Sequence, residues 1–253
     1  MRRSPVCKRR KAMKYFTKEW YKDTILSQMC FQIKKTDRAS HFSEKLFTST
    51  YEAQQKWFVR NEKYVAKHTK QPFDAEKAAI DFNKSYEENL EFVKANLPED
   101  ILSKVADIRV LALGCADYNT LEAVTRYCGQ INRRCEKVSE KYEEEVEALA
   151  ERTGWYKINS MNLLTNAPIV SAHKEDDRFI IETGKEYTNY ASRLTIISPE
   201  ISVCDALIGA IVLHFEILPI ENECVEISIL CQTPDENFVE FSAKAKDFNI
   251  EEL

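Results

Sequence analysis

The stretch that decides the fold of this chain is Leu207-Ile-Gly-Ala-Ile-Val-Leu-His-Phe-Glu-Ile217, followed after a short interval by Val225-Glu-Ile-Ser-Ile-Leu-Cys231. In the first segment every odd position is apolar or glycine, and in the second apolar residues alternate with Glu226 and Ser228. A period of two is typical of a β-strand with one buried face. We expect the two segments to form an antiparallel hairpin that turns about Ile220.

Shorter segments of the same kind lie on both sides of this hairpin. Residues 169–174 and 178–183 flank Glu175-Asp-Asp177, which is a typical turn sequence. Further strands are expected over residues 194–197, 238–241 and 248–250, with a proline-led turn over residues 233–237. Residues 155–167 show neither period and are expected to be a connector.

The period is helical before Gly154. Thr17, Ser43 and Asp74 are suitable N-caps for three helices, and a shorter helix is expected over residues 101–112. From residue 121 to residue 149 apolar residues recur at alternating steps of three and four, and only Glu145 interrupts them. This spacing predicts one long helix that ends before Gly154 and lies along a bundle. Gly129, inside that helix, suggests the close approach of a neighbouring helix.

These patterns predict an α+β protein in which an N-terminal antiparallel helical bundle, residues 13–154, precedes a C-terminal antiparallel β-sheet domain, residues 155–253. Residues 1–12 are expected to be a non-native leader. Lys8-Arg-Arg-Lys11 can be encoded as a purine run of the ribosome-binding type just ahead of Met13, where we expect translation to start. The alternative is a basic arm that contacts nucleic acid or a membrane.

The composition argues against several classes of protein. The chain of 253 residues has only five glycines, in neither a GxGxxG nor a GxxxxGK pattern, so no nucleotide cofactor is expected. Its four histidines form no metal-binding motif, and no metal site is expected. No apolar run reaches the length of a membrane span. The eight cysteines show no CxxC and are expected to be reduced thiols in a cytoplasm, with Cys128 and Cys135 buried and Cys204 exposed.

Charge is distributed unevenly along the chain. The formal net charge is −5, which becomes −11 without residues 1–12. Residues 155–253 hold seven basic and seventeen acidic side chains, a net charge of −10. An acidic chain without a basic stripe is a poor binder of nucleic acid, so a protein partner is expected. Four aromatic residues of the first helices follow the helical apolar spacing and are expected in the core and not in a base-stacking surface: Trp20, Tyr21, Trp57 and Phe58.

The candidate ligand-binding residues are His214, Glu216 and Glu226. A turn about Ile220 places His214 opposite Glu226, and Glu216 opposite Cys224, on the more polar face of the sheet. A carboxylate beside a histidine raises the pKa of the imidazole and is suited to acid–base chemistry or ligand binding. Such a pair is also an ordinary cross-strand contact that stabilises a sheet. No catalytic residue is assigned.

Three segments carry a resemblance to a known family. These are Met13-Lys-Tyr-Phe-Thr-Lys-Glu-Trp20, Ala106-Asp-Ile-Arg-Val-Leu-Ala-Leu-Gly114, and the C-terminal strand order ending in Ala245-Lys-Asp-Phe-Asn-Ile250. Over residues 13–253 the chain resembles the bacterial domain-of-unknown-function family 4085. The resemblance implies a helical N-terminal part, a β-rich C-terminal part, a start at Met13 and a Gram-positive bacterial cytoplasm. It implies no active-site residues.

Two functions follow as hypotheses. The first is a non-enzymatic cytoplasmic protein that binds another protein through its acidic β half, in one version as an immunity or antitoxin-like protein that neutralises a basic toxin. The alternative is an enzyme or small-ligand sensor with a pocket between the helical bundle and the sheet, near His214. The sequence does not indicate the oligomeric state.

Overall fold

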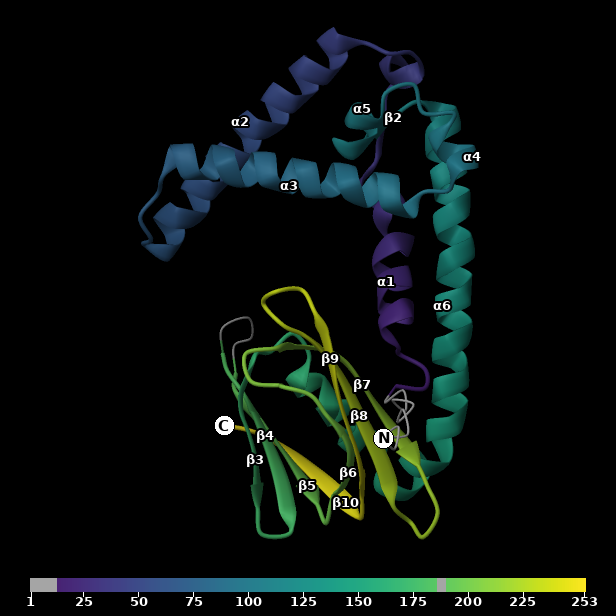
Figure 1. The fold of residues 1–253 in the computed structure, drawn as a ribbon, viewed down its shortest axis with the longest axis vertical. Coiled ribbons are helices and arrows are strands. Elements are labelled where there is room, and N and C mark those ends of the chain that lie inside the picture. The colour runs from purple at the N-terminus through teal and green to yellow at the C-terminus, as the bar shows by residue number, and fades with distance from the viewer. Residues whose placement is uncertain (1–12, 186–189) are drawn as a thin grey trace, which may run out of the picture. The chain divides into compact units, whose positions relative to one another are not determined.

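The computed structural model describes residues 13–185 and 190–253, so the expected leader, residues 1–12, lies outside the described residues. Nearly all helices precede the strands of the two larger sheets, which confirms the α+β class (Figure 1). The chain forms two compact units, one of residues 13–22 and 134–253 and the other of residues 23–133. The change of unit falls within helix α6 (Tyr118–Thr153) and not at Gly154, where the composition changes. We refer to the two as the β unit and the helical unit.

The helical unit is built around α2 (Glu44–Thr69) and α3 (Ala75–Asn96), which pack together through aromatic side chains. Both helices begin where the sequence predicts. The Ser43 hydroxyl accepts a hydrogen bond from the Leu46 backbone N–H at 3.2 Å, and the Asp74 carboxylate accepts from two backbone N–H groups of the first turn of α3. These caps supply partners for N–H groups that have none inside the helix.

The single short helix expected over residues 101–112 is two helices, α4 (Glu99–Leu102) and α5 (Ile108–Ala112). Asp107 separates them. Its buried carboxylate accepts from the backbone N–H of Arg109 at 3.1 Å and from the Arg109 guanidinium at 3.0 and 2.9 Å. A carboxylate that caps the residues after it starts a new helix, because its own backbone is extended. The smaller elements of this unit complete it: η1 (Met29–Gln32), β1 (Lys34–Lys35), η2 (Asp37–Ser40) and β2 (Cys115–Ala116).

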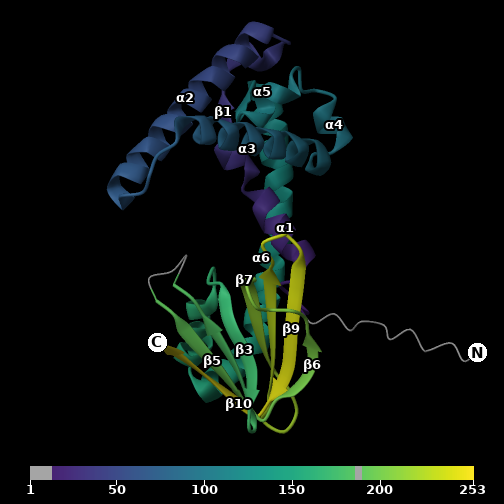
Figure 2. The ribbon, with the colours of Figure 1, turned by 60° about the vertical axis from the view of Figure 1, so that its left-hand side comes forward.

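The β unit is a sandwich of two antiparallel sheets, with strand orders β10-β5-β4-β3 and β6-β9-β8-β7. Figure 2 shows the two sheets facing each other. The strands are β3 (Ile169–Glu175), β4 (Arg178–Thr183), β5 (Ser192–Ile197), β6 (Glu200–Cys204), β7 (Ile211–Pro219), β8 (Val225–Gln232), β9 (Phe238–Ala245) and β10 (Asp247–Glu252). Strand β6 had no counterpart among the expected strands. Much of the expected connector is helical, as α7 (Trp155–Asn159) and η3 (Ser160–Leu164).

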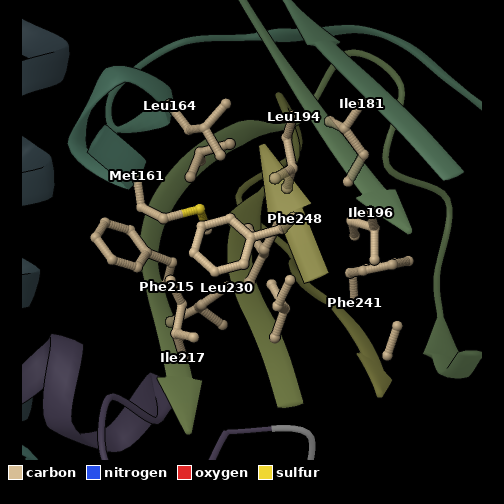
Figure 3. Close-up of a cluster of buried hydrophobic side chains, with 14 of the residues drawn as sticks. Met161, Leu164, Ile181, Leu194, Ile196, Phe215, Ile217, Leu230, Phe241 and Phe248 are labelled. Carbon is tan, nitrogen blue, oxygen red and sulfur yellow. The ribbon is translucent and has the colours of Figure 1, made fainter. Parts of the chain in front are cut away.

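The core of the β unit lies between the sheets (Figure 3). Ile181, Leu194 and Ile196 come from one sheet, and Phe241 comes from the other; all four are fully buried. Met161 of η3 joins the same cluster. Burying a large apolar side chain contributes about 1.5–3 kcal/mol, so the alternating residues of the two sheets supply the main stabilisation of this unit.

Long helix α6 ends as predicted, at Thr153 before Gly154. Cys128 and Cys135 on this helix are buried, as their spacing predicts. None of the described helices is both long and apolar enough to cross a membrane.

Gly114 and Gly129 differ in whether the structure leaves room for a side chain. Gly114 has a φ of 66°, and a Cβ there would lie 2.8 Å from the Gln32 carbonyl oxygen. Gly129 has no neighbouring atom within 4 Å of the position of a Cβ, so the expected close approach of another helix is absent at this residue. Gly114 is therefore required by the backbone, whereas Gly129 is a weak point in the helix.

We expect Gly129→Ala to raise the free energy of unfolding by about 0.5–1 kcal/mol, because alanine loses less backbone entropy in a helix. Gly114→Ala should lower it by about 1–3 kcal/mol, because the methyl group meets a carbonyl oxygen in a left-handed conformation. Urea denaturation followed by circular dichroism measures both. A destabilised Gly129→Ala variant would contradict this account of the helix.

Candidate functional site

Glu216, one of the candidate site residues, is a buried anchor for the N-terminal segment. It lies on β7, and only 1% of it is exposed. Its carboxylate accepts three consecutive backbone N–H groups, from Lys14 at 2.8 Å, Tyr15 at 2.6 Å and Phe16 at 2.5 Å. Burial raises the pKa of Glu216, while these three donors favour the charged form and lower it. The side chain is therefore occupied in holding residues 14–16 against the sheet.

His214 lies beside the same segment, in an aromatic cluster. Its ring centroid is 4.2 Å from that of Phe16 and 5.0 Å from that of Trp20. The backbone N–H of Phe215 donates to its Nδ1 at 3.0 Å. Burial lowers the pKa of His214, so the ring is held in its neutral form. A histidine in this position contributes packing to the N-terminal segment.

Helix α6 supplies a second set of contacts to this segment. The Glu145 carboxylate accepts from Lys14 Nζ at 2.8 and 2.6 Å and from the Tyr15 hydroxyl, and these hydrogen bonds lower the pKa of Glu145. The hydroxyl of Tyr142 accepts from the backbone N–H of Ile217 at 3.1 Å. Glu145 is the residue that interrupts the apolar spacing of this helix. The interruption therefore marks a polar contact that sequence spacing alone does not assign.

The expected pairing of His214 with Glu226 is wrong. In the observed register His214 lies opposite Leu230, Glu216 opposite Ser228, and Glu226 opposite Leu218. The hairpin turns about residue 222 and not about residue 220. Asn222 and Glu223 both adopt left-handed backbone conformations, with φ of 61° and 59°, which places the turn two residues later. A bulge between Val212 and His214 shifts the register once more.

The three candidate residues therefore do not form one site. His214 and Glu216 both contact the N-terminal segment, whereas Glu226 is half-buried and lies opposite Lys244 of β9 without forming an ion pair with it.

The exposed thiol of Cys204 is poorly suited to act as a nucleophile. Burial and the adjacent Asp205 carboxylate raise the pKa of Cys204, which is exposed as expected. In the described ranges no three His, Cys, Asp or Glu side chains are grouped so that they could hold a metal ion.

A pocket of about 650 Å³ lies at one end of the sandwich, at the β5–β6 and β7–β8 turns. Its lining includes two carboxylates, Glu200 and Glu221, and two ammonium groups, Lys244 and Lys246. Sequence reasoning missed these residues, because they are far apart along the chain and only the strand order brings them together. No sequence motif links these acidic and basic residues to one another.

Acidic side chains gather around this end of the sandwich. We define the acidic turn end as Glu175 at the end of β3, Asp176 of the β3–β4 turn, Glu200 at the start of β6, and Glu221 and Glu223 of the β7–β8 turn. The β3–β4 and β5–β6 turns are neighbours, because the Ser198 N–H donates to the Asp177 carbonyl at 2.7 Å. All five side chains are exposed, and none forms an ion pair with another described residue. Exposed carboxylates that form no ion pair favour binding of a cationic partner.

Comparison of the chain with protein-family models, with curated proteins and with solved structures gave no match. The resemblance to family 4085 therefore stays a prediction.

We expect Glu216→Gln to lower the free energy of unfolding by about 1.5–3 kcal/mol, because hydrogen bonds to a charged acceptor are lost and an amide group faces the Lys14 N–H. Glu226→Gln, the matched control on the next strand, should change it by less than about 0.5 kcal/mol. Chemical denaturation gives both values, and hydrogen exchange should be faster at the amides of residues 14–16 in Glu216→Gln only. Equal stability of the two variants would contradict the anchoring role.

Stability should also depend on pH through His214. The pKa of its side chain is lowered in the folded state, so the unfolded chain takes up a proton first as the pH falls below about 6.5. This contribution to stability is complete above pH 6.5 and is lost at lower pH, by at most about 1.4 kcal/mol per pH unit. The raised pKa of Glu216 acts in the opposite direction. The test is therefore the difference between the wild type and His214→Phe: stability of the variant should fall less between pH 6.5 and 5.

Proposed function

We propose that this chain is a non-enzymatic protein-binding module and that the acidic turn end of the β unit is its contact surface. The observation that carries the proposal is the set of exposed carboxylates at that end that form no ion pair with a described residue, in a segment, residues 155–253, whose net charge is −10. Complementary charge of this kind steers association and selects partners. The expected partner surface is basic.

The contacts of the candidate acid–base residues support a binding role for the protein over a catalytic one. Glu216 uses its carboxylate on three backbone N–H groups, and His214 is a neutral ring packed against Phe16 and Trp20. A general acid or base must reach a proton of the substrate. Glu216 is buried and His214 is half-buried, and both pack against the N-terminal segment.

The pocket at the acidic turn end offers a concave site for a side chain of the partner. Glu200 and Glu221 line it and form no ion pair with Lys244 or Lys246 of the same lining, so both carboxylates are available to a lysine or arginine side chain of a partner. Buried charged anchors of this kind dominate the energetics of many interfaces. An immunity or antitoxin-like role is the narrower version of the proposal, in which the partner is a basic toxin of the same bacterial cytoplasm. A toxin-like reading frame beside the gene would favour it.

The same pocket supports a second candidate function, that of a small-ligand sensor or enzyme. Its volume lies within the range of sites for small molecules. Lys244 and Lys246 would favour an anionic ligand, bound by charge-assisted hydrogen bonds. This candidate places the ligand inside the β unit.

We expect a stoichiometric partner, isolated from the native cell by cross-linking and then purified, to bind the wild type more tightly than a variant with Glu200→Lys, Glu221→Lys and Glu223→Lys. Reversing three carboxylates at the contact should weaken binding by at least about tenfold, through like-charge repulsion. The matched control reverses three exposed acidic residues elsewhere on the β unit: Asp235→Lys, Glu236→Lys and Glu252→Lys. Calorimetric titration with the purified partner measures the difference.

Equal weakening by both triple variants would contradict the assigned surface, because it would show an effect of net charge alone. A metabolite screen by thermal shift tests the second candidate. A rise of several degrees with an anionic compound, lost in Lys244→Ala with Lys246→Ala, would favour the ligand sensor instead.

A further inference from the structure

The second half of α2 carries four cationic side chains along one line, and a fifth follows directly after the helix. Lys56, Arg60, Lys63 and Lys67 are separated by steps of four, three and four residues, which places them on one face of the helix, and Lys70 is its left-handed C-cap. We call these five residues the α2 basic stripe. At 1.5 Å per residue the four helical positions extend over about 16 Å. All five residues are exposed.

A row of aromatic and polar side chains lies directly beside the stripe. Trp57, Asn61, Tyr64 and His68 repeat the same spacing one position further along the helix. Trp57 is 65% exposed and Tyr64 is 61% exposed. The His68 ring lies over Tyr64, with centroids 4.0 Å apart.

The expectation that Trp57 belongs to the core is therefore wrong. The neighbouring Phe58 takes the inward position, 5.8 Å from Phe82 of α3, and Tyr51 packs on the same α3 residue at 5.2 Å. Because the helix turns by about 100° per residue, a side chain one position before Phe58 points away from this contact. Two large aromatic rings are thus left in solvent within a basic surface.

The cations of the stripe are not neutralised within the described part of the chain. None of the five forms an ion pair there, whereas lysines of α3 do, with Lys77 bonded to Asp81 at 3.0 Å. Residues 56–70 contain one acidic side chain, Glu62, which lines a pocket at the α2–α3 turn. The segment has a net charge of +4 within a chain of net charge −5. Salt limits the reach of charges to about 8 Å in physiological solution, so the local sign decides what binds here.

We infer that this face of α2 binds single-stranded nucleic acid, with the phosphate backbone along the basic stripe and bases stacked on Trp57 and Tyr64. A cationic track beside aromatic rings is how proteins hold single strands without reading their sequence. The overall negative charge predicts a low affinity for nucleic acid, but this charge is a sum over the whole chain. The net charge of the whole chain does not describe a surface on which five cations lie within fifteen residues.

Other polyanions fit these observations less well. A duplex hides the faces of its bases, so Trp57 and Tyr64 would gain no stacking contact. A membrane-bound amphipathic helix inserts its apolar face, but the apolar face of α2 is packed on α3. An acidic protein would pair with the cations and leave the two rings without a specific role. Duplex, vesicle and acidic protein are therefore the competitors in the test.

The test is fluorescence anisotropy of labelled twelve-nucleotide oligo(dT) and oligo(U) titrated with the full chain at several salt concentrations. Five phosphate contacts predict a slope of about −3.5 for the logarithm of the binding constant against the logarithm of salt concentration. Lys63→Glu with Lys67→Glu should reduce the slope to about −2 and weaken binding at least tenfold. The matched control, Lys104→Glu with Arg133→Glu, changes the charge equally on exposed residues of the same unit that do not belong to α2, and it should bind like the wild type.

Stacking is tested separately at Trp57. Trp57→Ala should weaken binding by about 5- to 150-fold, whereas Trp57→Phe should retain most of it, because a phenyl ring still offers a face to a base. Both changes are at an exposed position, so circular dichroism should show an unchanged fold. Tryptophan emission should also be quenched when oligonucleotide is added to the wild type, and this quenching should be absent in Trp57→Phe.

Three results would overturn the inference. These are the absence of measurable binding at low salt, equal loss in the stripe and control variants, and competition by duplex DNA, anionic vesicles or poly-glutamate as effective as that by unlabelled single strand. The last would show a general polyanion surface. None of these results bears on the acidic turn end, so the proposed function stands or falls independently.

Discussion

The buried carboxylate of Glu216 is the interaction on which the β unit depends. It joins β7 to the backbone of residues 14–16, which lie some two hundred positions earlier in the chain. A buried charge is costly unless hydrogen-bonded donors surround it, and three N–H groups do so here. With these atoms in place, Phe16 packs on His214 and Lys14 reaches Glu145. The N-terminal segment thereby becomes part of the sandwich unit and not of the helices that follow it.

This anchor explains why residues that look suited to acid–base chemistry have a structural role. A histidine and a glutamate two positions apart on a strand are equally compatible with a reactive pair and with two contacts to another segment. The structure distinguishes the two by the partners of each polar atom. For Glu216 the partners are backbone N–H groups, and for His214 they are aromatic rings and the Phe215 amide. Function is consequently better sought on the exposed surfaces than among these buried groups.

The two compact units carry surfaces of opposite charge. In the β unit, the exposed carboxylates of the acidic turn end form no ion pair with a described residue, and in the helical unit the cations of the α2 basic stripe form none either. Unpaired charges of one sign on a surface repel one another, so each arrangement costs stability that a complementary partner would recover. Overall net charge conceals this division, since the two surfaces partly cancel in the sum.

Much of the secondary structure follows from local sequence. Ser43 and Asp74 start their helices, Gly154 follows the end of α6, and the Glu175-Asp-Asp177 turn joins β3 to β4 as predicted. Each depends on residues a few positions apart, within reach of caps, periods and turn types. The division of the helix at Asp107 was missed, because a capping carboxylate inside an apolar pattern is a weak signal. Strand β6 was missed for a similar reason: it is an exposed edge strand without a clear alternation.

What the sequence by itself determined is the α+β order of elements, the caps and the burial of Cys128 and Cys135, because these depend on spacing along one element. Only the tertiary structure decided the register of β7 with β8, the partners of Glu216 and the exposure of Trp57. The register depends on left-handed backbone at residues 222 and 223, the partners on a contact across two hundred residues, and the exposure on which face of α2 meets α3. None of these features depends on nearby residues alone. The same pattern of apolar residues is compatible with either strand register and with either face of α2 being exposed.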